Sequence, residues 1–221
     1  MVGQSSTTTG FYTMKRISLV MVTAAAFLGI GAASADGQYW GGFTKSQTYG
    51  SSAINSVVTD IYDDHDNPQL IGQKMTVNIN PTAGVGQPTA YYVGIGINNT
   101  MSGMYTSSGW KAYKSGLYEP AAIDAGGHET FTVFGGDMTI CQSVARQVML
   151  NEDGIGNVGS VQFYAGYGYI TPENQATMEK LYSQHATTVP SDTMQLMYAQ
   201  TQMMQSKAYQ KIYSVDCSIG N

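Results

Sequence analysis

The sequence contains few charged residues, and after residue 35 it has no long hydrophobic run. Only 11% of its 221 residues are charged, and ten Lys and Arg stand against fifteen Asp and Glu, which gives a net charge of −5. Because binding to nucleic acid requires clustered Lys and Arg, this balance argues against a nucleic-acid partner. A membrane-spanning helix needs about 18 consecutive apolar residues, so we also expect no transmembrane segment in the mature chain.

The motifs of common enzyme classes are also missing. The chain has three histidines, His65, His128 and His185, and none of them has the paired spacing of a zinc site. No G-x-S-x-G motif marks a serine nucleophile. The sequence therefore favours a protein without catalytic residues and without a cofactor.

The N-terminal region has the features of an export signal. A Lys-Arg pair follows Met14, residues 17–30 are apolar and rich in Ala, and residues 33–35 fit the small-x-small rule of signal peptidase. We expect translation to start at Met14 and residues 1–35 to form a leader and signal peptide. A membrane anchor is the alternative, but about 14 apolar residues are too few to span a bilayer. The expected location is the periplasm, the cell surface or the extracellular medium.

The expected mature part has two cysteines, Cys141 and Cys217. An even number of cysteines in an exported chain predicts a disulfide bond, because the compartment is oxidising. Closing a loop of about 75 residues would stabilise the fold by about 4 kcal/mol through the entropy of the unfolded chain. Two buried free thiols are the alternative.

Alternating apolar and polar residues predict several β-strands. Residues 74–80 and residues 91–97 both show this alternation, and we expect them to form a hairpin across the turn-forming residues 81–88. Gly94 and Gly96 would leave room for another part of the backbone to approach the second of these strands. Further strands are expected at residues 56–62, 69–71, 110–118, 129–134 and 161–170, the first two as another hairpin.

Residues 138–150 fit two patterns. Ile140, Val144 and Val148 have the spacing of a helix face, whereas the β-branched content and a following Asp-Gly turn are typical of a strand. We favour a strand here.

The C-terminal part predicts two helices followed by one strand. Thr171 and Pro172 form a helix start signal, and a second helix is expected after Pro190 with Ser191 as its cap. Residues 212–219 alternate again and predict the final strand.

These elements together predict a protein that is mainly β. The economical fold is a single antiparallel β-sandwich formed by residues 36–221, because the strands are short and separated by turns. The two C-terminal helices would be an insertion over about residues 172–211, before the last strand.

One turn between expected strands concentrates acidic residues. Asp63, Asp64 and Asp66 lie there within a few positions of one another. Calcium binds six to eight oxygen ligands, so these carboxylates are candidates for a structural calcium site. The segment lacks the glycine and the final glutamate of an EF-hand, which favours a solvated turn. A metal-dependent hydrolase that uses this turn or His128 is an alternative function.

Tyrosine is far more frequent than phenylalanine, with sixteen Tyr and six Phe. Tyr combines a flat apolar ring with a polar hydroxyl, which suits contact surfaces for glycans, proteins or other copies of the chain. The candidate contact residues are Trp110, Tyr113, Tyr118 and Tyr164.

Methionines are frequent near the C-terminus, at Met194, Met197, Met203 and Met204. They could form an adaptable binding face or bind copper through their thioether sulfurs. Their helical spacing favours packing of a helix against the sheet instead.

The order of the strands over residues 74–170 resembles β-sandwich modules of bacterial cell-envelope and extracellular proteins. The resemblance rests on a Trp followed by Gly-Leu-Tyr-Glu-Pro, a Phe-Thr-Val-Phe strand and the sequence Phe-Tyr-Ala-Gly-Tyr-Gly. It implies no catalytic residue. We therefore expect an exported, non-catalytic binding or structural protein of the bacterial envelope or extracellular matrix, acting through Tyr-rich surfaces on a protein or glycan partner or on copies of itself. A membrane-active secreted toxin is a second alternative, beside the metal-dependent hydrolase.

Overall fold

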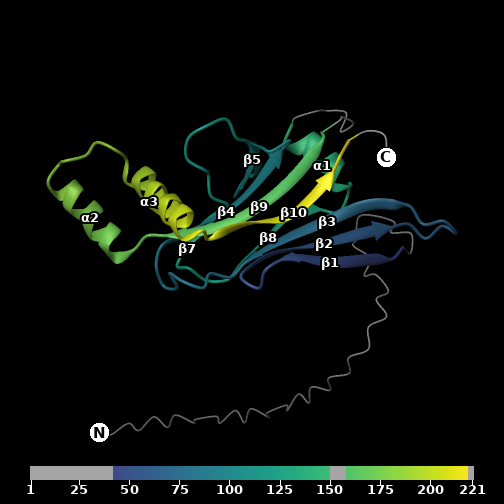
Figure 1. Ribbon diagram of the computed structural model, residues 1–221, viewed down its shortest axis with the longest axis horizontal. Helices are drawn as coiled ribbons and strands as arrows, with labels where there is room; N and C mark the ends of the chain where they lie inside the picture. The colour runs from purple at the N-terminus through teal and green to yellow at the C-terminus, as the bar shows by residue number, and fades with distance from the viewer. Residues whose placement is uncertain (1–41, 150–157, 219–221) are drawn as a thin grey trace, which may run out of the picture. The chain divides into compact units, whose positions relative to one another are not determined.

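The computed structural model describes residues 42–149 and 158–218. The expected leader and signal peptide, residues 1–35, lies outside them. The described residues form two antiparallel sheets and three helices, as Figure 1 shows. The predicted fold class, a mainly β antiparallel sandwich with two helices before its last strand, is thus confirmed.

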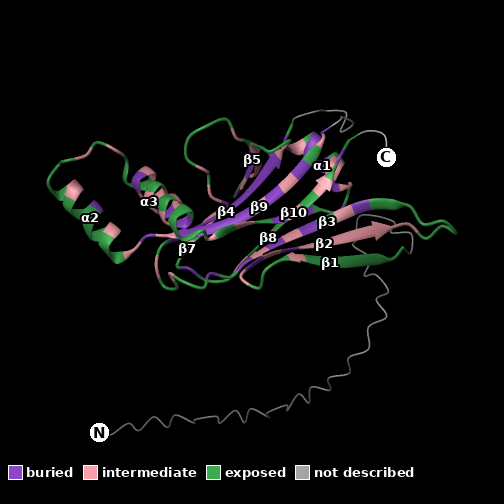
Figure 2. Cartoon of the chain, viewed as in Figure 1, coloured by how far each residue is buried: buried purple, intermediate pink, exposed green. Residues whose placement is uncertain are grey.

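Each sheet combines strands from distant parts of the chain. The first sheet has the order β1 (Thr44–Gly50), β2 (Ile54–Tyr62), β3 (Leu70–Ile79) and β8 (Glu129–Gly135). The second has the order β10 (Tyr209–Asp216), β9 (Ser160–Tyr169), β4 (Thr89–Ile97), β5 (Thr100–Thr106) and β6 (Gly109–Ala112), and the short β7 (Ala122–Asp124) also pairs with β4. Figure 2 shows that the internal strands β4 and β9 are largely buried, whereas the edge strand β1 is exposed.

The core lies between the sheets, where alternating apolar side chains of both meet. Met75, Val77 and Ile79 of β3 are fully buried, in agreement with the predicted alternation. Phe134 of β8 and Phe163 of β9 pack edge to face, with ring centroids 5.9 Å apart, and so join the two sheets. Burial of each such side chain contributes about 1.5–3 kcal/mol, so the alternation decides which faces of the strands meet.

The two expected hairpins have different outcomes. β2 and β3 pair as predicted, with Tyr62 opposite Leu70. The expected hairpin between residues 74–80 and 91–97 is wrong, because β3 lies in the first sheet and β4 in the second. Residues 81–88 therefore cross between the sheets. Alternation identifies the buried face of a strand but not its neighbour, so it does not distinguish a hairpin from such a crossing.

The expected strand over residues 138–150 is also wrong, because α1 (Ile140–Gln147) occupies this segment. The Thr139 hydroxyl accepts a hydrogen bond from the Gln142 N–H (3.3 Å), and the Gln142 side-chain oxygen accepts one from the Thr139 N–H (3.0 Å). This capping box satisfies two backbone donors at the start of the helix. The apolar side chains with helical spacing are buried. Their spacing therefore indicated the structure of this segment correctly, whereas its β-branched content did not.

The two C-terminal helices are α2 (Pro172–Ser183) and α3 (Ser191–Ser206). Figure 1 shows them together at one end of the sheets, with α1 at the other end. Thr171 caps α2 as predicted. The predicted cap of α3 is wrong, because Pro190 is the residue before the helix and Ser191 is already helical.

The helical insertion is shorter than the predicted residues 172–211. Lys207 ends α3 in a left-handed conformation, with φ at 54°, and β10 begins at Tyr209. The final strand therefore starts before the predicted residues 212–219. A register shift after Lys211 places Ile212 in the core and interrupts the simple alternation from which the prediction was made.

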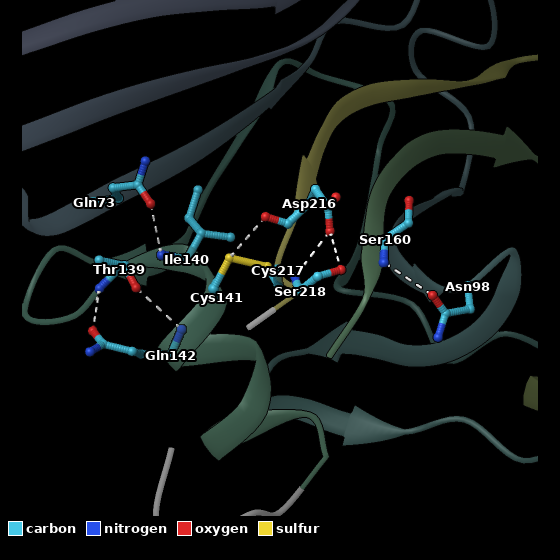
Figure 3. Close-up of a disulfide and its surroundings, with 10 residues drawn as sticks. All are labelled: Gln73, Asn98, Thr139, Ile140, Cys141, Gln142, Ser160, Asp216, Cys217 and Ser218. Atoms are coloured by element: carbon cyan, nitrogen blue, oxygen red, sulfur yellow. Dashed lines mark hydrogen bonds between the residues drawn. A yellow bond between two sulfur atoms is a disulfide. The ribbon is translucent and has the colours of Figure 1, made fainter. Parts of the chain in front are cut away.

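The predicted disulfide bond joins Cys141 of α1 to Cys217, which follows β10, and it closes a loop with a sequence separation of 76 (Figure 3). Their Cα atoms are 5.4 Å apart. The start of α1 is also fixed by Gln73 of β3, whose side-chain oxygen accepts a hydrogen bond from the Ile140 N–H (3.0 Å). The bond thus connects a helix held by the first sheet to the last strand of the second.

Candidate ligand-binding site

The aromatic residues predicted to form a contact surface do not all lie together. Trp110 of β6 faces the core: its indole N–H donates a hydrogen bond to the Val133 carbonyl (3.1 Å), and its ring stacks on Phe134 at a centroid distance of 5.6 Å. The indole thus covers the edge strand β8 of the first sheet. Trp110 therefore belongs to the packing between the sheets and not to an open surface, since a surplus of aromatic residues does not reveal which face each one occupies.

Tyr113 and Tyr118 follow β6, which ends at Ala112, so the strand predicted over residues 110–118 is shorter than expected. Their rings pack together with centroids 5.2 Å apart. Tyr118 and Tyr164 of β9 both line a pocket on the outer face of the second sheet. The structure thus brings two of the four predicted contact residues to one site, and Tyr113 supports one of them.

This pocket, named the Met–Tyr pocket below, has a volume of about 160 Å³. Its lining comes from β4, β5, β9, β10, α3 and the connection between β6 and β7, so residues far apart in the sequence meet there. Four methionines line it, namely Met101, Met104, Met203 and Met204. Four tyrosines line it as well, namely Tyr92, Tyr118, Tyr164 and Tyr209.

Two glycines of the sheet make space for the Met–Tyr pocket. Across β4 and β9, Gly94 lies opposite Tyr164 and Gly166 lies opposite Tyr92. Each of these tyrosines therefore has a glycine beside it, and at both glycines the atoms of neighbouring residues pack where a side chain would otherwise lie. A Cβ atom on Gly94 would lie 3.1 and 3.2 Å from the sulfur atoms of two lining methionines. The absence of a side chain at Gly94 thus makes room for thioether side chains. The sequence had instead predicted a close approach by another part of the backbone.

A close backbone approach does occur between α3 and β9. A Cβ atom on Gly168 would lie 1.9 Å from the carbonyl oxygen of Ala199, so this packing requires glycine. Because α3 is held so close to the sheet, Met203 is only 3% exposed. Met204 lines the same pocket and is 48% exposed, so the pocket opens to solvent beside it.

The C-terminal methionines do not form the single group that the sequence suggested. Met194 packs in a small cluster between α2 and α3, and Met197 is exposed. Only Met203 and Met204 reach the Met–Tyr pocket, where two methionines of β5 join them. The two methionines of β5 reach the pocket because of strand pairing. The spacing of methionines along one helix gives no information about that pairing.

Tyr92 is the most deeply buried tyrosine of the pocket. It is 3% exposed, and its hydroxyl has no hydrogen-bond partner among the described residues. Burial raises the pKa of Tyr92 above its usual value of 10.0, so the hydroxyl remains a hydrogen-bond donor. A buried hydroxyl without a partner is destabilising, and this oxygen has almost no accessible surface, so the ring of Tyr92 and not its hydroxyl is available to a guest.

The predicted calcium ligands lie in the turn between β2 and β3. Asp63 accepts a hydrogen bond from the Gln69 N–H (2.9 Å) and lies 3.0 Å from His65 Nδ1. The hydrogen bond from Gln69 outweighs partial burial and, together with His65, lowers the pKa of Asp63. Asp64 and Asp66 are exposed. The described part of the chain contains no group of three or more His, Cys, Asp or Glu side chains that could hold a metal ion.

A second polar cluster, which the sequence did not reveal, lies beside β7. The Tyr91 hydroxyl donates a hydrogen bond to Asp124 (2.7 Å), and Glu129 lies next to the same carboxylate. Burial raises the pKa of Glu129, and the Asp124 carboxylate raises it further. Burial opposes ionisation of Asp124 as well, but hydrogen bonds from Tyr91 and from backbone N–H groups outweigh it and lower the pKa. His128, the candidate base, is exposed beside this cluster.

No protein-family model, no curated protein and no solved structure matches this chain. Its function is therefore inferred from the site itself. Among the helices that the structure describes, none is long and apolar enough to cross a membrane.

Proposed function

We propose that the chain is an exported binding protein that holds a compact apolar group of a small molecule in the Met–Tyr pocket. The observation that carries the proposal is the convergence of four tyrosines and four methionines around one pocket, beside two glycines of the sheet. Ligand sites are typically concave and largely apolar, with a small number of polar groups that orient the ligand. The four tyrosines supply most of the aromatic surface of this lining.

The volume of the pocket limits the size of the group that can bind in it. An apolar cavity of about 150 Å³ accepts benzene or xenon, and the Met–Tyr pocket has about 160 Å³. A single ring or a branched group of similar size therefore fits. Methionine side chains are unbranched and adapt to the shape of a guest. This favours a small molecule over the extended protein or glycan partner expected from the number of tyrosines, because a stable protein interface buries about 1,200 Å² or more.

Export to an oxidising compartment is part of the proposal. The Cys141–Cys217 bond supports it, because such bonds persist outside the cytosol and are rare inside it. The expected signal peptide supports it as well, although residues 1–35 lie outside the described part of the chain.

Methyl NMR of the protein purified from the periplasm of an expression host tests the proposal. Methionine ¹³C-methyl groups are labelled, and benzene is the probe. We expect the signals of Met101, Met104 and Met203 to move on addition of benzene, because these residues line the pocket. Met75 in the core and Met178 between α2 and α3 are internal controls that should not move. No change at the pocket methionines, or an equal change at all five, would contradict the proposal.

Two valine substitutions provide a matched pair of variants. Gly94→Val places its side chain against flexible thioether ends at 3.1–3.3 Å and should fill the pocket. Gly135→Val, at the end of β8, adds the same side chain where the nearest atom to its Cβ is 3.9 Å away. We expect Gly94→Val to abolish the response to benzene and Gly135→Val to keep it, with circular dichroism confirming that both variants fold. Unchanged binding by a folded Gly94→Val variant would place the benzene site elsewhere.

A further inference from the structure

The lining of the Met–Tyr pocket differs from that of an ordinary apolar site. Among the described residues that line it there is no Leu, Ile, Val or Phe, and none is charged. Its walls are tyrosine rings and methionine thioethers, which present electron-rich and polarisable surfaces. We propose that the bound group is a quaternary ammonium, such as trimethylammonium. This inference rests on the proposed function and names its ligand class.

A quaternary ammonium matches this lining better than other cations. It has no N–H groups, so it needs no hydrogen-bond acceptors, and its methyl groups pack against apolar walls. Aromatic rings attract a cation within about 6 Å of the ring centroid, and aromatic cages bind quaternary ammonium groups through this contact. A primary ammonium would bury N–H donors in a pocket without charged lining residues, which is destabilising.

The tyrosines of the pocket come from different elements of the fold. Tyr92 and Tyr164 stand on the neighbouring strands β4 and β9, and Tyr209 extends from the edge strand β10. Tyr118 comes from the connection after β6, where its N–H donates a hydrogen bond to the side-chain oxygen of Gln200 on α3 (2.9 Å). Three strands and one connection therefore contribute the tyrosines that line this one pocket.

Two lysines lie opposite lining residues of the pocket and bear on the binding of a cation. Lys111 forms an ion pair with Glu119. Lys211 lies opposite Tyr164 on β10, is exposed and does not line the pocket. The net charge of −5 attracts cations to the protein as a whole. Lys211 is thus a nearby positive charge that should weaken binding of a cation but not of a neutral guest.

Choline and 3,3-dimethylbutan-1-ol are matched probes, because they differ only in the replacement of the charged nitrogen by carbon. Their dissociation constants are measured from the methyl signals of the pocket methionines in the purified protein. We expect choline to bind at least about tenfold more tightly, which corresponds to about 1.4 kcal/mol. Equal affinity, or tighter binding of the alcohol, would overturn the inference.

Variants of Tyr209 test the role of the rings. Tyr209 is 43% exposed, so its replacement carries little risk to the fold. Tyr209→Leu should weaken choline binding about threefold, and Tyr209→Phe, which keeps the ring, should leave it unchanged. The affinity for the neutral alcohol should change by less than about twofold in both variants. Equal losses for Leu and Phe, or equal effects on both probes, would contradict a contact between the ring and a cation.

Lys211→Gln tests the charge of the guest separately. We expect this variant to bind choline more tightly and the neutral alcohol as before, with the gain disappearing at high salt. An equal gain for both probes would show that Lys211 acts through packing and would count against a cationic guest.

Failure of this inference differs from failure of the proposed function. If benzene moves the pocket methyl signals but choline has no advantage over its neutral isostere, the pocket binds neutral guests and only the inference fails. If none of the three probes moves the signals of Met101 and Met203, both fail.

Discussion

Replacement of Gly168 by alanine should displace α3 from the second sheet. The added Cβ would lie 1.9 Å from the carbonyl oxygen of Ala199, well inside the 3.0 Å below which real Cβ contacts essentially never occur. The opposing atom belongs to the backbone, so α3 must retreat by about 1 Å to relieve the clash. Overpacking of this kind costs about 1–3 kcal/mol. Because Ala199 and Met203 would also lose part of their burial, we expect a loss near the upper end of that range.

Urea unfolding followed by circular dichroism measures this loss, with Gly96→Ala as the control. On Gly96 the nearest atom to an added Cβ is a ring carbon of Tyr164 at 3.4 Å, an ordinary contact, so the free energy of unfolding should change by less than about 0.5 kcal/mol. Gly168→Ala should also weaken benzene binding, because Met203 is a wall of the Met–Tyr pocket. An equal free energy of unfolding for the two variants would refute the close packing of α3 against β9.

Three further predictions concern the rest of the fold. Reduction of the Cys141–Cys217 bond should lower the free energy of unfolding by about 4 kcal/mol, measured as a lower urea midpoint in the presence of reductant; an unchanged midpoint would contradict this. Thr139→Ala removes the cap of α1 and should cost about 0.5–2 kcal/mol in the same assay, whereas no loss would show that the cap is dispensable. Burial raises the pKa of Tyr91 and Tyr92 above 10.0, so the folded state keeps protons that the unfolded state loses. Stability should therefore be retained below pH 10 and fall as the pH rises above it, with tyrosinate absorbance from these two residues appearing only on unfolding; early absorbance would contradict their burial.

The sandwich and its core were predictable because local patterns report burial directly. Met75 and Ile79 alternate with polar residues, and both are fully buried. The pairing of strands was less predictable, since the same alternation fits a hairpin and a crossing between sheets. The error at α1 could have been avoided, because Thr139 and Gln142 have the spacing of a capping box.

The candidate site was only partly predictable. Tyr118 and Tyr164 were identified as contact residues from their chemistry, and both line the pocket. Met101 and Met104 were not, because β5 joins the site through its pairing with β4 and local sequence contains no such information. A signal was nevertheless present, since β9 alternates glycine with tyrosine over residues 166–169, and Tyr92 of β4 lies opposite Gly166 in their register.

The occupancy of the Met–Tyr pocket is tested most directly by isotope-filtered NOE spectroscopy of bound benzene with ¹³C-methyl methionine. A guest inside the pocket should show NOEs to the methyl groups of Met101, Met104 and Met203, which surround the same space. NOEs confined to Met178 or other methionines outside the pocket would contradict ligand binding at this site.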